Sequence, residues 1–80
     1  MDQTDNNMRQ TLDLKGLKCP LPALKTSKLL TQMAAGEEVE VISTDPMAQI
    51  DIPHLVQSTG NELVTQSNTA EQFTFLIRKS

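Results

Sequence analysis

The chain has 80 residues, enough for one domain but not for two. Its formal net charge of −3 argues against a general nucleic-acid binder, which would present a basic face. It has one cysteine and therefore no internal disulfide, whereas small secreted domains usually need such bonds, so we expect a cytoplasmic protein. No apolar stretch approaches membrane-spanning length, and we expect no membrane insertion.

The N-terminal stretch is polar and rich in Asp and Asn. It lacks the apolar segment of a signal peptide. We expect residues 1–10 to form a flexible tail, mobile from Met1 to Met8, and residues 11–80 to form a single domain.

A strand and a helix are predicted on either side of the cysteine. Apolar and charged residues alternate between Thr11 and Lys15, which is typical of a short half-buried strand. We expect the first helix to run from Pro20 to about Ala35, followed by Gly36, because proline is favoured at the first helical position and glycine after the last. At 3.6 residues per turn, the buried face of this helix would carry Pro22, Thr26, Leu29, Leu30 and Met33.

The next elements are a strand and an interrupted helix. Valines alternate with glutamates in residues 37–43, so we expect one face of this strand to meet helices and the other to meet solvent. Pro53 would remove a backbone hydrogen bond in the middle of a helix. We therefore expect a short turn at Met47–Gln49 and a second start with Asp51 as the cap, after which Ile52, Leu55, Val56 and Thr59 form the buried face.

The last elements, residues 63–67 and 72–78, are predicted to be the two strands of a hairpin. The order is then βαβαββ, with the first two strands parallel and joined by a right-handed crossover. The predicted fold is an α+β two-layer sandwich, in which two helices pack on one face of a mixed four-stranded sheet. The order of the strands within the sheet stays open.

The stretch Lys18-Cys19-Pro20-Leu21-Pro22 carries most of the chemical information. We place Cys19 at the N-cap of the first helix, where unpaired N–H groups and the helix dipole favour a thiolate. Because neither proline has an N–H, we predict that the Leu21 N–H binds the sulfur directly and that Lys18 adds positive charge. The pKa of the thiol should then lie below the free value of about 8.5.

An activated lone sulfur suits a relay of sulfane sulfur. Acyl transfer by cysteine needs a base, and the only histidine, His54, is more simply explained as a solvent-facing helix residue. Helix capping accounts for Asp45 and Asp51. No metal-ligand spacing or phosphate loop is present, so we expect no metal and no cofactor. The alternative stays open that Cys19 is a buried structural side chain in a non-catalytic interaction or regulatory module.

A resemblance to a known family supports the relay. The segment Leu12-Asp13-x-Lys15-Gly16-Leu17-x-Cys19-Pro20-x-Pro22 resembles the opening motif of the TusA/SirA-like sulfur-carrier (sulfurtransferase) family, and the similarity extends over about Thr11 to Lys79. The resemblance implies a two-layer sandwich of βαβαββ order and a persulfide on Cys19. It also implies a sulfur donor, a cysteine desulfurase or rhodanese-like protein, and an acceptor relay protein.

The residue between the two prolines differs from that of the tRNA-thiolation branch of the family, which is acidic there, so the pathway stays open. Here it is Leu21, which falls with Leu24 on the lysine side of the predicted helix. We predict a partner-docking patch on a monomeric protein; the alternative is that both leucines pack back against the tail or Leu17. The predicted docking residues are Leu21, Leu24, Lys25 and Lys28.

Overall fold

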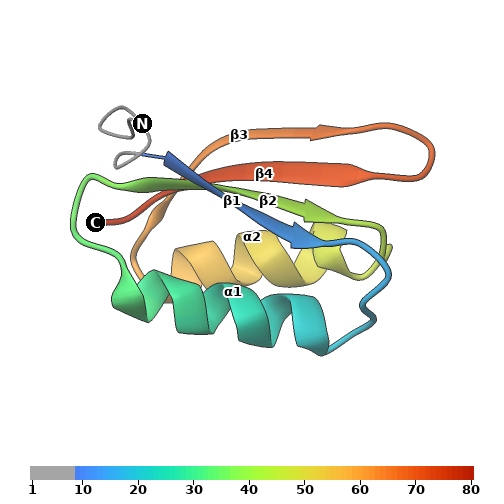
Figure 1. The fold of residues 1–80 in the computed structure, drawn as a ribbon, viewed down its shortest axis with the longest axis horizontal. Helices are drawn as coiled ribbons and strands as arrows, with labels where there is room; N and C mark the ends of the chain where they lie inside the picture. The colour runs from blue at the N-terminus through green and yellow to red at the C-terminus, as the bar shows by residue number, and fades with distance from the viewer. Residues whose placement is uncertain (1–8) are drawn as a thin grey trace, which may run out of the picture.

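Six elements follow one another in the computed structural model, which describes residues 9–80 (Figure 1). They are β1 (Arg9–Leu14), α1 (Leu21–Gln32), β2 (Glu38–Ser43), α2 (Ala48–Ser58), β3 (Glu62–Asn68) and β4 (Phe73–Arg78). The predicted βαβαββ order is confirmed. The tail predicted for Met1 to Met8 lies outside the described residues. Arg9 and Gln10 belong to β1, where they pair with β2, so the tail prediction was wrong for these two residues.

The four strands form one mixed sheet in the order β1-β2-β4-β3. The neighbours β1 and β2 run parallel, as predicted, and the other two pairs are antiparallel. The register aligns Leu12 with Val41, and Val41 with Phe75, so apolar side chains form rows across the sheet. A register shift between Leu63 and Thr65 interrupts the ladder of β3, the edge strand of the hairpin.

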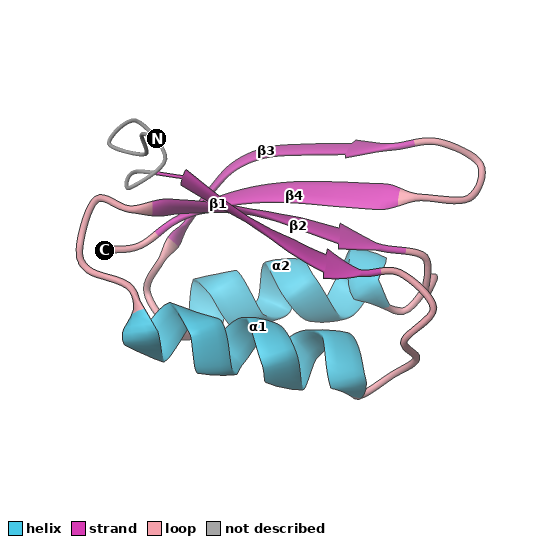
Figure 2. Ribbon diagram, viewed as in Figure 1, coloured by secondary structure: helices cyan, strands magenta, loops and turns pink. Residues whose placement is uncertain are grey.

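Both helices cover the same face of the sheet, which confirms the two-layer prediction (Figure 2). Alternation along the strands and 3.6-residue periodicity along the helices direct the apolar side chains into the space between the layers. The buried core consists of Leu14, Leu30, Met33, Val39, Val41, Ala48, Ile52, Val56, Phe73, Phe75 and Ile77. Both helices begin at the end of the sheet where β1 and β2 finish, so the two strand-to-helix loops lie at this same end (Figure 1).

Helix α1 ends three residues earlier than predicted. Gln32 is its last residue, because Met33 adopts an extended backbone and buries its side chain in the core. The Glu37 carboxylate accepts the Ala34 N–H at 2.9 Å, and the Glu37 N–H donates to the Ala34 carbonyl at 3.0 Å. These bonds close a turn in which Gly36 has a φ of +92°, a conformation that glycine adopts without steric cost.

Helix α2 is continuous through Pro53, so the predicted interruption and the Asp51 cap were wrong. The turn before it is built from backbone bonds three residues apart, such as Ala48 N–H to the Asp45 carbonyl at 2.9 Å. Asp51 lies inside the first turn of α2 rather than before it. Gln49, whose carbonyl would accept the N–H that proline lacks, is an exposed residue, so the helix tolerates the missing bond.

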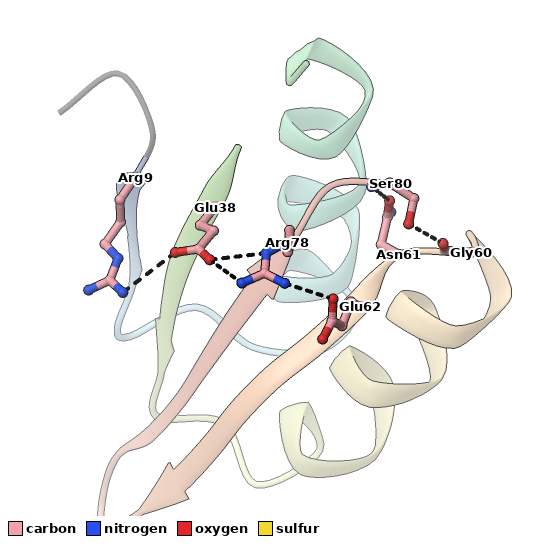
Figure 3. Close-up of polar contacts among 7 residues, drawn as sticks. All are labelled: Arg9, Glu38, Gly60, Asn61, Glu62, Arg78 and Ser80. Carbon is pink, nitrogen blue, oxygen red and sulfur yellow. Dashed lines mark hydrogen bonds and ion pairs between the residues drawn. The ribbon is translucent and has the colours of Figure 1, made fainter. Parts of the chain in front are cut away.

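A row of charged side chains crosses the other end of the sheet (Figure 3). Arg78 of β4 donates to Glu38 of β2 at 2.9 Å and to Glu62 of β3 at 3.1 Å. Arg9 of β1 lies 3.5 Å from Glu38. The row follows the strand register, since Arg9 pairs with Glu38, and Arg78 pairs with both glutamates. It therefore links all four strands at this end.

The C-terminal residues are also tied down at this end. The backbone of Lys79 accepts the Gly36 N–H and donates to the Glu37 carbonyl, both at 2.8 Å. The Lys79 ammonium donates to the carbonyl of Leu30 in α1 at 2.7 Å. Ser80 donates its backbone N–H to Asn61 at 2.9 Å and its hydroxyl to the carbonyl of Gly60 (Figure 3).

Candidate functional site

Cys19 lies in the loop between β1 and α1, and its thiol is free and exposed. The loop turns sharply, with Leu17 N–H donating to the Leu14 carbonyl at 3.1 Å. Gly16, at a φ of +85°, donates its N–H to the Thr44 hydroxyl of the next strand-to-helix loop at 2.9 Å. Leu17 packs against the core. The loop is thus fixed by the hydrogen bond to Thr44 and by the packing of Leu17, while the sulfur of Cys19 is exposed to solvent. The alternative that Cys19 is a buried side chain is therefore wrong.

Asp45 holds the backbone of the cysteine. The Cys19 N–H donates to Oδ2 of Asp45 at 2.6 Å, a short charge-assisted bond. The other carboxylate oxygen accepts the Met47 N–H at 3.3 Å, at the start of α2. The Asp45 N–H in turn donates to the hydroxyl of Ser43, which is fully buried. Asp45 therefore connects the cysteine loop to the loop that begins α2.

Asp51 faces the sulfur itself. The Cys19 Sγ lies 3.4 Å from Oδ2 of Asp51, in a geometry in which the thiol donates and the carboxylate accepts. Asp51 belongs to the first turn of α2, one turn beyond Met47, and is half-buried. The two aspartates thus have separate partners, one the amide and the other the thiol of the same residue.

These contacts raise the pKa of the Cys19 thiol above its ordinary value. The largest cause is the hydrogen bond to Asp51, followed by partial desolvation and by the negative charges of Asp51 and Asp45. A hydrogen bond from the neutral form, and an anion nearby, both disfavour the thiolate. The predicted lowering of this pKa was therefore wrong, because the sulfur meets carboxylates of α2 rather than free amides of α1.

The predicted bond from the Leu21 N–H to the sulfur was also wrong. This N–H donates to the carbonyl of Lys18 at 2.8 Å and closes a turn over Cys19 and Pro20. The N-cap of α1 is Pro20, one residue after the predicted position, and no side chain caps the helix. The first bond of α1 runs from Leu24 N–H to the Pro20 carbonyl at 3.1 Å. The cysteine thus precedes the helix instead of capping it.

The predicted docking residues occupy the exposed side of α1. Leu21 is 43% exposed and Leu24 is 58% exposed. Lys25 and Lys28 are exposed as well. The structure adds two exposed apolar side chains that the sequence analysis did not select, Met47 and Ile50, which lie on either side of the start of α2.

Other predicted site residues fall into place more simply. Lys18 is exposed and adjacent to Cys19, and His54 is a solvent-facing residue of α2, as expected. Pro22 is buried. Among residues 9–80, no three metal-binding side chains cluster and no pocket is present. Within the same residues, no helix has the length and apolar character needed to cross a membrane.

Asp45 and Asp51 were not predicted to be neighbours of the sulfur. They lie 26 and 32 residues beyond Cys19, and helix capping was the predicted role of both. A usable signal was nevertheless present. The first two strands were predicted to be parallel, and the carboxyl ends of adjacent parallel strands share one edge of a sheet. Residues that follow β2 are therefore expected near residues that follow β1.

Comparison with known proteins identifies the family of this chain. The family model described as sulfurtransferase TusA matches residues 10–79. A sulfur carrier protein TusA of Allochromatium vinosum is 44% identical over 71 residues, covering 89% of this chain and 93% of the relative. The protein of the same name from Pseudomonas entomophila is 41% identical, covering 86% of each chain, and that of Pseudomonas putida is 38% identical, covering 95% of each. The chain therefore belongs to the sulfurtransferase TusA family.

Proposed function

We propose that this protein is a sulfur carrier that accepts sulfane sulfur as a persulfide on Cys19 and passes it to a partner protein. The observation that carries the proposal is the exposed thiol at the end of a loop that is fixed by bonds to Thr44 and Asp45. Sulfur carrier proteins at 38–44% identity over most of the chain support the same role.

The transfer needs one cysteine in this protein and no second thiol of its own. The Cys19 sulfur attacks the terminal sulfur of a donor persulfide, the donor leaves as a thiol, and Cys19 now carries the additional sulfur. In the second transfer, an acceptor thiol attacks that terminal sulfur and Cys19 is released as a thiol. Neither step changes the net oxidation state of the pair, since each exchanges a thiol and a persulfide.

The partners that suit this chemistry are proteins. A cysteine desulfurase or a rhodanese-like protein would present the donor persulfide, and a relay protein would take the sulfur from Cys19. We propose that the carrier meets them as a monomer in the cytoplasm. Leu21 and Leu24, together with Lys25 and Lys28, would form the docking patch, because both leucines are exposed within two turns of the cysteine.

Mass spectrometry of the intact protein tests the carrier function. After incubation with a cysteine desulfurase and L-cysteine, we expect one added sulfur on the wild type, lost on reduction. The Cys19→Ser variant should take up none while keeping its fold, because the replaced side chain is exposed. If no desulfurase, rhodanese or thiosulfate donor loads the wild type, the proposal is wrong and a non-catalytic interaction module is the better account.

A variant of the leucines tests the docking patch separately from the chemistry. Leu21→Gln combined with Leu24→Gln removes the apolar contact and leaves the lysines in place. Sulfur uptake from the desulfurase should fall severalfold, whereas alkylation of Cys19 by iodoacetamide should stay unchanged. Thr31→Gln, an exposed change near the other end of α1, is the matched control. Equal uptake by the double variant and this control would exclude the leucines from docking.

A further inference from the structure

We propose that Asp51 is a catalytic residue of the sulfur relay, which takes the proton from Cys19 as the sulfur is transferred and gives it to the sulfur of the departing donor. This inference rests on the proposed carrier function. It gives a role in proton transfer to a carboxylate that lies 32 residues beyond the cysteine in the sequence.

The geometry singles out Asp51 among the groups near the sulfur. Its Oδ2 lies 3.4 Å from Sγ, within reach of the thiol proton. Asp45 is the other nearby carboxylate, but its two oxygens accept the backbone N–H groups of Cys19 and Met47. Asp45 therefore positions the cysteine, whereas Asp51 contacts the atom that reacts.

The charges around the sulfur make a proton acceptor useful. Asp51 of α2 and Asp45 of the preceding loop face the thiol, Lys18 is adjacent to it in the chain, and His54 lies one turn further along α2 on the exposed side. The two carboxylates favour the protonated thiol at neutral pH. Attack on a persulfide requires the thiolate, so the proton has to leave Sγ during the transfer. The carboxylate that already accepts this proton is placed to receive it.

The transfer balances without an added oxidant or reductant. As the Cys19 sulfur forms a bond to the terminal sulfur of the donor persulfide, the Sγ–H bond breaks and the proton moves to Oδ2 of Asp51, from which it passes to the donor and not back to Cys19. The S–S bond of the donor breaks, and its inner sulfur leaves with the electron pair. Asp51 then gives the proton to this departing sulfur, so that a thiol is released and the carboxylate is restored. The reverse sequence serves delivery to the acceptor.

Asp51→Asn keeps the size of the side chain and removes both its charge and its ability to accept a proton. The effects of this variant on two different rates distinguish proton transfer from a purely electrostatic role. Two rates are measured over a range of pH: alkylation of Cys19 by iodoacetamide, and sulfur uptake from glutathione persulfide. The inflection in the pH profile of the alkylation rate should move to lower pH. The alkylation rate at neutral pH should then rise about tenfold for each pH unit of that shift. Sulfur uptake should become slower by about tenfold or more, despite the larger thiolate fraction.

The opposite directions of the two rates are the decisive result. If both rates rise together, Asp51 only suppresses the thiolate, and the proposal is wrong; it is equally wrong if neither rate changes. Asp51→Glu should restore part of the uptake, and Glu71→Gln, which neutralises an exposed acid in the β3–β4 loop, should leave both rates unchanged. If the wild type takes up no sulfur from glutathione persulfide or a desulfurase, the carrier function fails, and the alkylation profile still shows whether Asp51 holds the thiol proton.

Discussion

The two ends of the sheet use carboxylates in different ways. At one end, Glu38 and Glu62 lie beside the guanidinium of Arg78 and raise its pKa. At the other end, Asp51 and Asp45 lie beside the thiol of Cys19 and raise its pKa as well. The same physical effect stabilises the charged form of arginine and the neutral form of cysteine.

The functional consequence of the raised pKa differs between the two ends, because arginine keeps its proton whereas the thiol has to lose it. Arginine is charged at every physiological pH, so the row of ion pairs is a permanent link between strands. The thiol has to lose its proton in order to react, so its carboxylates set the conditions of reactivity. The strength of the ion pairs at the Arg78 end is therefore expected to depend on salt, and the reactivity of Cys19 at the other end is expected to depend on pH.

The largest change in stability is expected from Asp45→Ala, since this carboxylate accepts two backbone N–H groups that join the cysteine loop to α2. A good hydrogen bond to a charged group contributes about 2 kcal/mol to folding, and the bond to Met47 N–H is long at 3.3 Å, so we expect a total loss of about 2–3 kcal/mol. Denaturation in urea measures it. Asp13→Ala, which removes a local bond to Lys15 N–H and an exposed ion pair with the Lys15 ammonium at the same end, should cost clearly less. Equal losses in the two variants would show that Asp45 does not anchor the loop.

A second change should stabilise the protein without affecting either end. Thr26 is fully buried in α1, and within the described chain its hydroxyl has no hydrogen-bond partner. Thr26→Val removes this unsatisfied group at nearly constant volume, and we expect a gain of about 1 kcal/mol. The melting temperature should rise by about 4–8 °C for a domain of this size. Thr31→Val, on the exposed side of the same helix, should change it little, and a fall in stability of the Thr26 variant would contradict the assignment.

Replacement of Arg78 tests the end that holds the ion pairs. Arg78→Met keeps the apolar part of the side chain and removes the bonds to Glu38 and Glu62. The free energy of unfolding should fall modestly at low salt, and the difference from wild type should shrink as salt is added, because the pairs are exposed and screened. Arg9→Met, which among residues 9–80 loses the longer contact with Glu38, should have a smaller effect. Any change in the alkylation rate of Cys19 would show that the two ends are coupled.

The smallest expected effect is a pH dependence of stability at the cysteine end. The pKa of Cys19 is higher in the folded protein than the value of about 8.5 in an unfolded chain. Its contribution to stability is therefore complete below about pH 8.5 and is lost as the pH rises through the folded-state pKa. The stability of the wild type relative to Cys19→Ser should decrease as the pH rises above about 8.5. An increase in relative stability above about pH 8.5 would contradict the contacts with Asp51 and Asp45.

Much of the fold follows from local patterns. Alternation in β2 and β4 identified the inward faces, with Val39, Val41 and Phe75 among the fully buried residues. The two-layer arrangement followed from the glutamates on the outer face of β2. Strand order could not be predicted, because alternation shows which face is buried but not which strand is the neighbour. The interruption at Pro53 was predicted from the missing N–H alone, whereas packing of Ile52 and Val56 keeps the helix continuous.

The candidate site was predicted only where it is local in the sequence. The exposed Cys19 and the exposed side of Leu21 and Leu24 follow from the strand-turn-helix position and the helical periodicity. The chemical environment of the sulfur could not be predicted from these local patterns, since it depends on side chains from the next loop and helix. A helix start was assumed to offer free amides to Cys19, but the preceding turn uses the Leu21 N–H internally. The sign of the pKa shift was wrong for this reason.

The fixed C-terminus gives the protein a convenient attachment point. The C-terminus lies at the end of the sheet opposite the loop between β1 and α1 (Figure 1). The bonds of Ser80 to Asn61 and Gly60 use its amide and hydroxyl groups (Figure 3). Neither group is lost when the chain is extended from its carboxyl group. A fused reporter or a surface linker added there would leave the sulfur pointing into free solution, which suits single-molecule or biosensor measurements of carrier encounters.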